Sequence, residues 1–195
     1  AGKKIAKVDV KGEVCGCTIN REGELVVAVN EEQGVVTYML NEKDGSLSSD
    51  VVMDSMTVGA TSENALCNGD ENYDYYLRGA SRLYGYDSSS KQSIPLLDYT
   101  ASAMQMTECM YVVPVSAQQA LGIYDGAGSA TLASYRRLKP SEIKEKQIIT
   151  VGGLYLDGNS SISDAIAAFN KSNPEYQIEM KNYSMDNCVE QFNLD

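Results

Sequence analysis

Acidic side chains are the residues of this chain with the clearest potential for catalysis. Paired carboxylates can hydrolyse glycosidic bonds, and the acids to consider are Asp70, Glu71, Asp74, Asp87 and Asp98. Most of them fall in turn-like or strand-edge sequence, where carboxylates are ordinarily solvated. The sequence has no histidine, which excludes nucleophile systems that depend on a histidine base. We therefore predict that the chain is not an enzyme.

Metal-binding patterns are incomplete in this sequence. DENYD at 70–74 matches the opening of a calcium loop, but Tyr75 stands where the loop needs glycine and Ser81 where it needs glutamate. Five cysteines without any histidine form no zinc pattern. Cys15 and Cys17 are two apart in a strand-like stretch, so we expect both on one face as small buried apolar residues. No metal and no cofactor is predicted.

A glycine-rich loop, VGGLYLDGNSS at 151–161, stands between a predicted strand and a predicted helix. It lacks the GxGxxG spacing and a lysine before the helix, so a nucleotide site is not expected. Ligands of open α/β sheets bind beyond the carboxyl ends of the strands. Tyr155, Asp157 and Tyr183 are therefore the candidate ligand-binding residues, and a surface loop without ligand contact is the alternative.

The chain has 13 tyrosines and no tryptophan. A tyrosine ring offers an apolar face and a hydroxyl, so such rings can stack on sugars or pack between sheets. Alternation places Tyr73, Tyr75, Tyr84 and Tyr86 together on one face, and we favour packing for this group.

The chain is acidic, with 27 acidic against 16 basic residues and a formal net charge of -11. This charge repels nucleic acid and anionic membrane surfaces. The longest apolar runs, such as LVVAV at 25–29, fall short of the roughly 18 residues that a membrane-spanning helix needs. The opening AGKKIAK lacks the apolar core of a signal peptide, so we expect a signal peptide or lipid anchor upstream.

The stretch from 13 to 137 consists of short β-rich runs separated by Gly, Asn, Asp and Ser. Tyr38, Tyr84 and Ile123 mark the middles of equivalent strands, at spacings of 46 and 39 residues that suit a four-stranded propeller blade. A β-sandwich is the alternative. The expected strands span 14–19, 25–30, 35–40, 47–53, 72–78, 82–87, 93–99, 109–115, 120–125 and 130–138.

These strands predict a mainly β fold whose first region, 1–138, is a propeller-like stack of about three four-stranded blades. The blades are expected at 13–54, 64–99 and 103–138. Three blades cannot close a ring, because propellers typically need four to eight. Open sheet edges invite pairing with another chain, so self-association is expected.

A charged linker at 139–147, with a short helical turn from Pro140, leads into a β-α-β piece at 148–195. Its strands are expected at 148–156 and 176–183. The helix between them should have Ser161 as its N-cap, with Asp164 at the capping-box position, and should end at Pro174. Its apolar stripe is expected at Ile162, Ala165, Ile166 and Phe169.

The run KQIITVGGLYLDGNSSISDAIAAFNKSNPEYQIEMKNYS at 146–184 resembles the start of the extracellular solute-binding proteins of ABC importers. The likeness lies in Gly152 near the end of a strand, Phe169 near the end of a helix, Asn173 and Pro174, and the strand 176–183. CVEQFNLD at the end resembles that family's second helix. The preceding β region resembles the propeller-like segment found before this domain in some Gram-positive surface lipoproteins.

The resemblance implies a truncated first lobe of a two-lobed α/β fold. It implies an extracellular protein of the bacterial surface that captures a small solute, with a carbohydrate as the favoured class, for an ABC permease. The alternative is a propeller-type module that binds or hydrolyses glycans.

Overall fold

The computed structural model describes residues 2, 4, 7–32, 34–41, 43–53, 65–79, 81–126, 128–154, 156 and 159–183. The fold is mainly β, as the sequence predicts, and none of the described sheets closes into a ring. The chain divides into two compact units, Ala1–Leu96 with Pro114–Gln118 and Leu97–Val113 with Gln119–Asp195. Among the described residues, no helix has the length and apolar character needed to cross a membrane.

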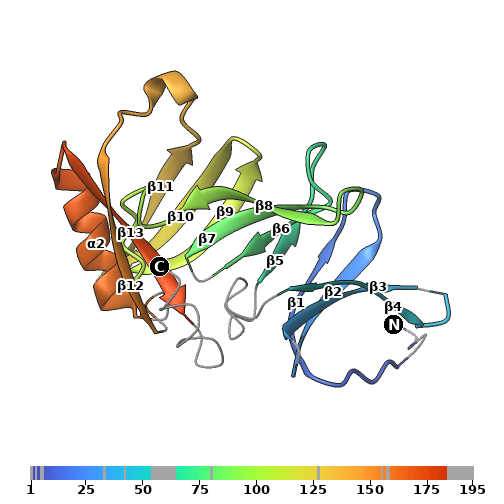
Figure 1. Ribbon diagram of the computed structural model, residues 1–195. Helices are drawn as coiled ribbons and strands as arrows, with labels where there is room; N and C mark the ends of the chain where they lie inside the picture. Colours follow the sequence, from blue (N-terminus) through green and yellow to red (C-terminus); the bar gives the residue numbers. More distant parts are fainter. Residues whose placement is uncertain are drawn as a thin grey trace. The chain divides into compact units, whose positions relative to one another are not determined.

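The first sheet is an antiparallel meander of four strands in chain order (Figure 1). Its strands are β1 (Glu13–Ile19), β2 (Leu25–Glu31), β3 (Gly34–Leu40) and β4 (Leu47–Met53). The turn after β1 forms because the Asn20 carboxamide oxygen accepts the backbone N–H groups of Glu22 (3.0 Å) and Glu24 (2.8 Å). Gly23 supplies the positive φ of 85° that this turn requires.

The second sheet repeats this arrangement in the same unit, with four strands in chain order. They are β5 (Leu66–Asn68), β6 (Tyr75–Arg78), β7 (Arg82–Asp87) and β8 (Gln92–Asp98). The sequence prediction missed β5, because three residues are too few to display an alternation. It also began the next strand at residue 72, whereas Asp70, Glu71 and Asn72 belong to the turn before β6.

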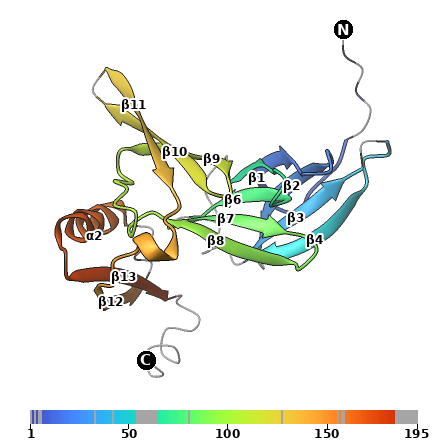
Figure 2. The same ribbon diagram turned by 90° about the horizontal axis from the view of Figure 1, so that it is seen from above.

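The apolar core of this unit takes its members from both sheets, whose strands lie beside one another in Figure 2. Its members are Cys15, Val26, Ala28, Val35, Ala65, Leu66, Tyr75, Leu77 and Tyr86. The rings of Tyr75 and Tyr86 are stacked, with their centroids 4.7 Å apart. The packing role predicted for the tyrosine group is therefore confirmed for these two, which are 1% and 0% exposed.

Strands β1 and β5 approach each other closely. A Cβ atom on Gly16 would lie 3.1 Å from the backbone nitrogen of Leu66, so glycine makes this approach possible. The prediction that Cys15 and Cys17 share a face is wrong, because Cys15 is 3% exposed and Cys17 is exposed. A β-bulge between Val14 and Gly16 shifts the register of β1 and separates the two thiols.

Asp74 is a buried acid that connects the first sheet to the second. Its carboxylate lies 3.1 Å from the Arg21 guanidinium and accepts the Ser88 N–H at 2.6 Å. Its backbone carbonyl accepts the N–H of Arg21, and its own N–H donates to Tyr86. A buried carboxylate is tolerated only with such partners, so Asp74 is a structural residue.

The third sheet has the strand order β11-β10-β9. Its strands are β9 (Cys109–Ser116), β10 (Gln119–Gly126) and β11 (Ser129–Arg136). The predicted third blade thus holds three strands rather than four in the part of the chain that the structure describes.

The expected helical turn in the linker is present as a short 3-10 helix, η1 (Pro140–Glu142). The Arg136 guanidinium donates to both carboxylate oxygens of Glu142, at 2.9 and 3.0 Å. These hydrogen bonds, together with one from the backbone of Lys139, lower the pKa of Glu142 to about 2. Beyond η1 lie β12 (Gln147–Leu154), α2 (Ser160–Ser172) and β13 (Tyr176–Tyr183).

Replacing Asp74 with alanine should lower the free energy of unfolding by about 2–4 kcal/mol, because Arg21 and the Ser88 N–H lose a buried partner. Urea denaturation followed by circular dichroism measures this change. Asp9→Ala is the matched control, since the Asp9 side chain is 83% exposed, and it should leave the midpoint unchanged. A wild-type midpoint for Asp74→Ala would contradict the structural role of this carboxylate.

Candidate functional site

Strands β12 and β13 pair in parallel, and α2 stands between them in the chain. Figure 1 shows α2 along one face of this strand pair. The carboxyl ends of the two strands therefore meet at one edge, where Leu154 lies opposite Tyr183. Open parallel sheets bind their ligands at this edge, so it is the candidate site that the topology indicates.

Of the three predicted ligand-binding residues, the structure describes only Tyr183. Tyr155 and Asp157 lie outside the described residues. Tyr183 is the last residue of β13 and is 5% exposed. Its ring lies across Gly152, where an added Cβ would come within 2.8 Å of it, and the Lys181 ammonium lies 5.7 Å from the ring centroid. The ring thus packs on the sheet.

Asparagines organise the carboxyl edge, and the sequence analysis gave them no role there. The Asn182 carboxamide oxygen accepts the backbone N–H of Leu156 at 2.7 Å, which ties the chain after β12 to the end of β13. Asn159 is the N-cap of α2, because its carboxamide oxygen accepts the Ile162 N–H at 3.2 Å. The short polar side chain directly before Ser160 was the available signal.

The predicted N-cap of α2 is therefore wrong. Ser161 lies inside the helix, which begins one residue earlier at Ser160. Asp164, which was expected to complete a capping box, is hydrogen-bonded instead to the hydroxyl and backbone N–H of Thr107. This carboxylate joins the helix to the loop before β9, within the second unit.

The buried face of α2 is rotated from the predicted apolar stripe. The buried residues are Ser163, Ile166, Ala167 and Asn170. Of the residues predicted for the stripe, Ile166 is buried, whereas Ile162 is 37% exposed. Two of the four buried residues, Ser163 and Asn170, are polar, and an apolar pattern does not register them.

Asn170 is one of these polar residues. Its carboxamide oxygen accepts the Ile178 N–H at 2.7 Å, and its amide nitrogen donates to the Ile178 carbonyl at 2.9 Å. The same nitrogen lies 3.5 Å from the Thr100 carbonyl. The Lys146 ammonium donates to the carbonyls of Asn170 and Asn173 at the end of the helix, at 2.8 Å each. Together these contacts fix α2 against β13.

Two of the acids considered for catalysis, Asp87 and Asp98, are engaged in local hydrogen bonds. Asp87 accepts hydrogen bonds from Ser89 and Ser90, and Asp98 accepts them from Thr100 and Ala101. Both carboxylates thereby close the turns that follow their strands.

Asp70 organises the turn before β6. It accepts the backbone N–H groups of Asn72 and Tyr73, and the Tyr76 hydroxyl donates to it at 2.5 Å. Burial acts to raise the pKa of Asp70, but these hydrogen bonds together hold it below its ordinary value of 3.8. Burial and the bond to Asp70 raise the pKa of Tyr76 well above its ordinary value.

Neither a metal cluster nor a disulfide occurs among the described residues. No group of three or more acidic, cysteine or histidine side chains there is arranged to hold an ion. Cys15, Cys17, Cys67 and Cys109 are not in disulfides. Burial raises the pKa of Cys15 and of Cys67, so both are held as neutral thiols.

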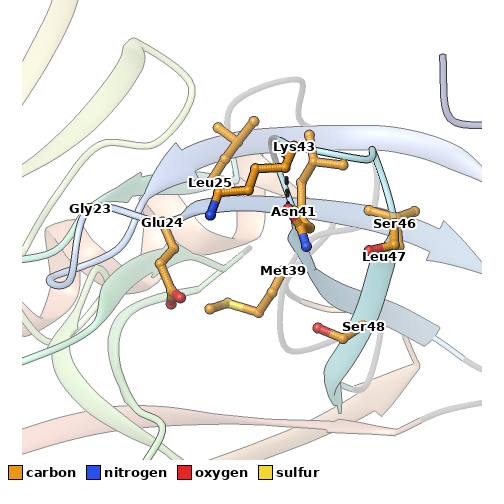
Figure 3. Close-up of a pocket in the computed structure, with 10 residues that line it drawn as sticks. Gly23, Glu24, Leu25, Met39, Asn41, Lys43, Ser46, Leu47 and Ser48 are labelled. Carbon is orange, nitrogen blue, oxygen red and sulfur yellow. Dashed lines mark hydrogen bonds between the residues drawn. The ribbon is translucent and has the colours of Figure 1, made fainter. Parts of the chain in front are cut away.

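A pocket of about 650 Å³ lies at the turn end of the first sheet (Figure 3). Its apolar lining is Leu25, Met39, Leu40 and Leu47. Its polar lining includes Glu24, Asn41, Lys43, Ser46 and Ser48. Figure 3 shows Glu24, Met39 and Ser48 pointing to the same side of the sheet. The volume is within the range of small-molecule sites.

Hydrogen bonds within the turns hold polar groups of this pocket in position. The Asn41 carboxamide oxygen accepts the Lys43 N–H at 3.0 Å, and the Asn20 amide donates to the Glu24 carboxylate at 3.0 Å. The lining thus offers one carboxylate, one ammonium group, an amide and two hydroxyls, together with apolar side chains from both faces of the sheet. Such a surface can hydrogen-bond a small polar solute.

Comparison with known proteins gave no match: no family model, no curated protein and no solved structure matches this chain.

Tyr76→Phe should raise the pKa of Asp70, because the burial of the carboxylate remains while its hydroxyl donor is lost. In the wild type, the low pKa of Asp70 contributes stability above the unfolded value, which is lost as pH falls through the folded value. The variant should therefore lose less stability than the wild type between about pH 5 and about pH 3.

Carboxyl-carbon NMR titration measures the pKa of Asp70, and urea denaturation at the two pH values measures the stability. Tyr38→Phe is the matched control, since it removes a hydroxyl that donates to Glu31 at 2.5 Å in the first sheet. An Asp70 pKa equal in wild type and Tyr76→Phe would refute the role of the hydroxyl.

Proposed function

We propose that the chain is a non-catalytic binding protein of the bacterial cell surface. In this proposal the segment from β12 onward is the opening part of a solute-binding α/β lobe, and the parent protein delivers a captured solute to an ABC permease. The β region before it acts as an accessory module.

The observation that carries the proposal is the parallel pairing of β12 and β13 around α2. It brings the carboxyl ends of both strands and the capped start of α2 to one edge, as a ligand site of an α/β lobe requires. Ile148 is 51% exposed and Leu154 is 45% exposed. Parallel strands are ordinarily covered on both faces, so these exposures fit a strand pair that belongs to a larger sheet.

The ion pair and hydrogen bonds that these acids form support a binding role over a hydrolytic one. Asp74 is buried against Arg21, and Asp87 and Asp98 close turns. A glycosidase needs one carboxyl group that protonates a leaving group and a second that attacks or activates water. Carboxylates committed to main-chain and guanidinium donors are poorly suited to either task.

A glycan-binding module is the second candidate function, and the pocket of the first sheet favours it. That pocket combines apolar side chains such as Met39 with the polar groups of Glu24, Lys43 and Ser48. Glycan recognition by the β region alone would need no contribution from β12, α2 and β13.

Gene deletion tests the import proposal in the organism that produces the protein. Loss of the gene should slow the uptake of one neutral sugar, and the purified full-length protein should bind that sugar in isothermal titration calorimetry. Unchanged uptake across a sugar panel, with no small solute bound, would defeat the proposal. Hydrolysis of a chromogenic glycoside that disappears in Asp98→Asn would support a glycan-hydrolysing module instead.

Self-association through open sheet edges is part of the proposal. Strand β11 is an edge strand of the third sheet, and its Leu132 is 67% exposed. An exposed edge that carries apolar side chains favours pairing with a second copy.

Light scattering on the purified chain should therefore give a mass above that of a monomer, and the mass should rise with concentration. Leu132→Lys should shift the equilibrium toward monomer, because a charge on an edge strand opposes pairing. Leu121→Lys is the comparison variant. It lies in the central strand β10, which has a neighbour on each side and offers no edge to a second copy. A monodisperse monomer for the wild type at all concentrations would contradict self-association.

A further inference from the structure

Tyr124 in β10 lies over a glycine of its own strand. A Cβ atom on Gly122 would come within 2.7 Å of the Tyr124 ring and 3.0 Å of its hydroxyl. The ring therefore lies close against the backbone of the sheet, and only glycine at 122 leaves room for it. Tyr124 is half-buried. Because one side of the ring faces the sheet, its exposed area belongs to the other side and to its edge.

Tyr135 in β11 meets Tyr124 through its hydroxyl. The two hydroxyl oxygens are 2.5 Å apart, and either can donate to the other. Tyr135 is also half-buried. A phenolic hydroxyl donates once and accepts through its oxygen. The Tyr124 hydroxyl also has a hydrogen bond with the Cys109 side chain of β9. The Tyr135 hydroxyl is therefore the member of the pair that is left to donate to, or accept from, a ligand.

The residues around this pair are small. The register of β10 and β11 pairs Ala120 with Tyr135, Gly122 with Ala133 and Tyr124 with Thr131. These partners share one face of the antiparallel sheet. Between the two tyrosines this face therefore carries a hydrogen atom at Gly122 and a methyl group at Ala133. No bulky side chain of these two strands stands between the rings.

We propose that Tyr124 and Tyr135 form a binding site for a neutral carbohydrate on the β9–β11 sheet. The apolar face of a pyranose ring packs on the Tyr124 ring, and a sugar hydroxyl bonds to the Tyr135 hydroxyl, which Tyr124 holds in place. The net charge of -11 disfavours anionic sugars. This site lies outside the β12–β13 edge, so it extends the proposed function with a second, independent point of carbohydrate contact.

The geometry also separates this pair from the stacked Tyr75–Tyr86 pair and from Tyr183. Tyr75 and Tyr86 are stacked but 1% and 0% exposed, and Tyr183 is 5% exposed. Those rings are committed to packing. Tyr124 and Tyr135 combine partial exposure, a ring held against the backbone and paired hydroxyls, which are the features that sugar recognition needs.

Tyrosine fluorescence gives a direct assay, because the chain has no tryptophan to dominate the emission. The probes are hexasaccharides of four neutral glycans: α-1,4-glucan, β-1,4-glucan, β-1,4-xylan and β-1,4-mannan. Titration of the whole chain with each, checked by isothermal titration calorimetry, should show binding of at least one. Tyr124→Ala should weaken that binding about tenfold through the loss of ring contact.

Hydroxyl-deleted variants keep the test informative if Tyr124→Ala folds poorly. Tyr124→Phe and Tyr135→Phe retain both rings and should each weaken binding about threefold to tenfold, through the lost hydrogen bond. Tyr38→Phe controls for loss of a tyrosine hydroxyl elsewhere. Leu132→Ala, which falls on the opposite face of β11 by strand alternation, controls for loss of a side chain from the same sheet.

The outcomes separate this site from the import proposal. Absence of binding to all four hexasaccharides, or equal affinity of wild type and both phenylalanine variants, overturns the tyrosine site whatever the uptake result. Oligosaccharide binding that depends on Tyr124 and Tyr135 supports the site even where gene deletion leaves sugar uptake unchanged.

Discussion

The close approach of β1 to β5 is the constraint on which the first unit depends. Gly16 leaves room for the backbone of Leu66, and the Cys15 carbonyl accepts the Ala65 N–H at 3.2 Å. Thr18 donates its hydroxyl to Asn68 at 2.8 Å. These contacts bring the first strands of two consecutive sheets together. A four-stranded sheet with two apolar faces needs such a neighbour, so contact between sheets is a condition of stability here.

The polar contacts between the sheets follow from that approach. The Thr37 and Tyr75 hydroxyls lie 3.1 Å apart inside the core, and Asp74 reaches Arg21 at its margin. Buried polar groups of this kind fix a relative position more strictly than apolar packing does, because each requires a partner at a defined distance. They also occupy the Asp74 carboxylate with two structural partners, Arg21 and the Ser88 N–H.

Sequence patterns predicted the strands well, because apolar alternation and turn residues act over a few neighbouring positions. They failed where a distant or polar contact decides the outcome. Strand β5 is defined by pairing with β6, and the bulge at Cys15 by its register with β2. On α2, Asn170 is buried because it bonds to Ile178. Asn182 at the carboxyl edge acts through Leu156, a contact that no local pattern encodes.

A tyrosine ring beside a glycine recurs along the chain. Tyr73 lies within 2.5 Å of a Cβ built on Gly85, Tyr124 within 2.7 Å of one on Gly122, and Tyr183 within 2.8 Å of one on Gly152. The glycine removes the side chain that would hold the ring away from the sheet, so an aromatic residue covers backbone in a chain without tryptophan. What differs is the hydroxyl. Tyr124 bonds to a second half-buried tyrosine, and this contact is the basis of the carbohydrate site proposed on the third sheet.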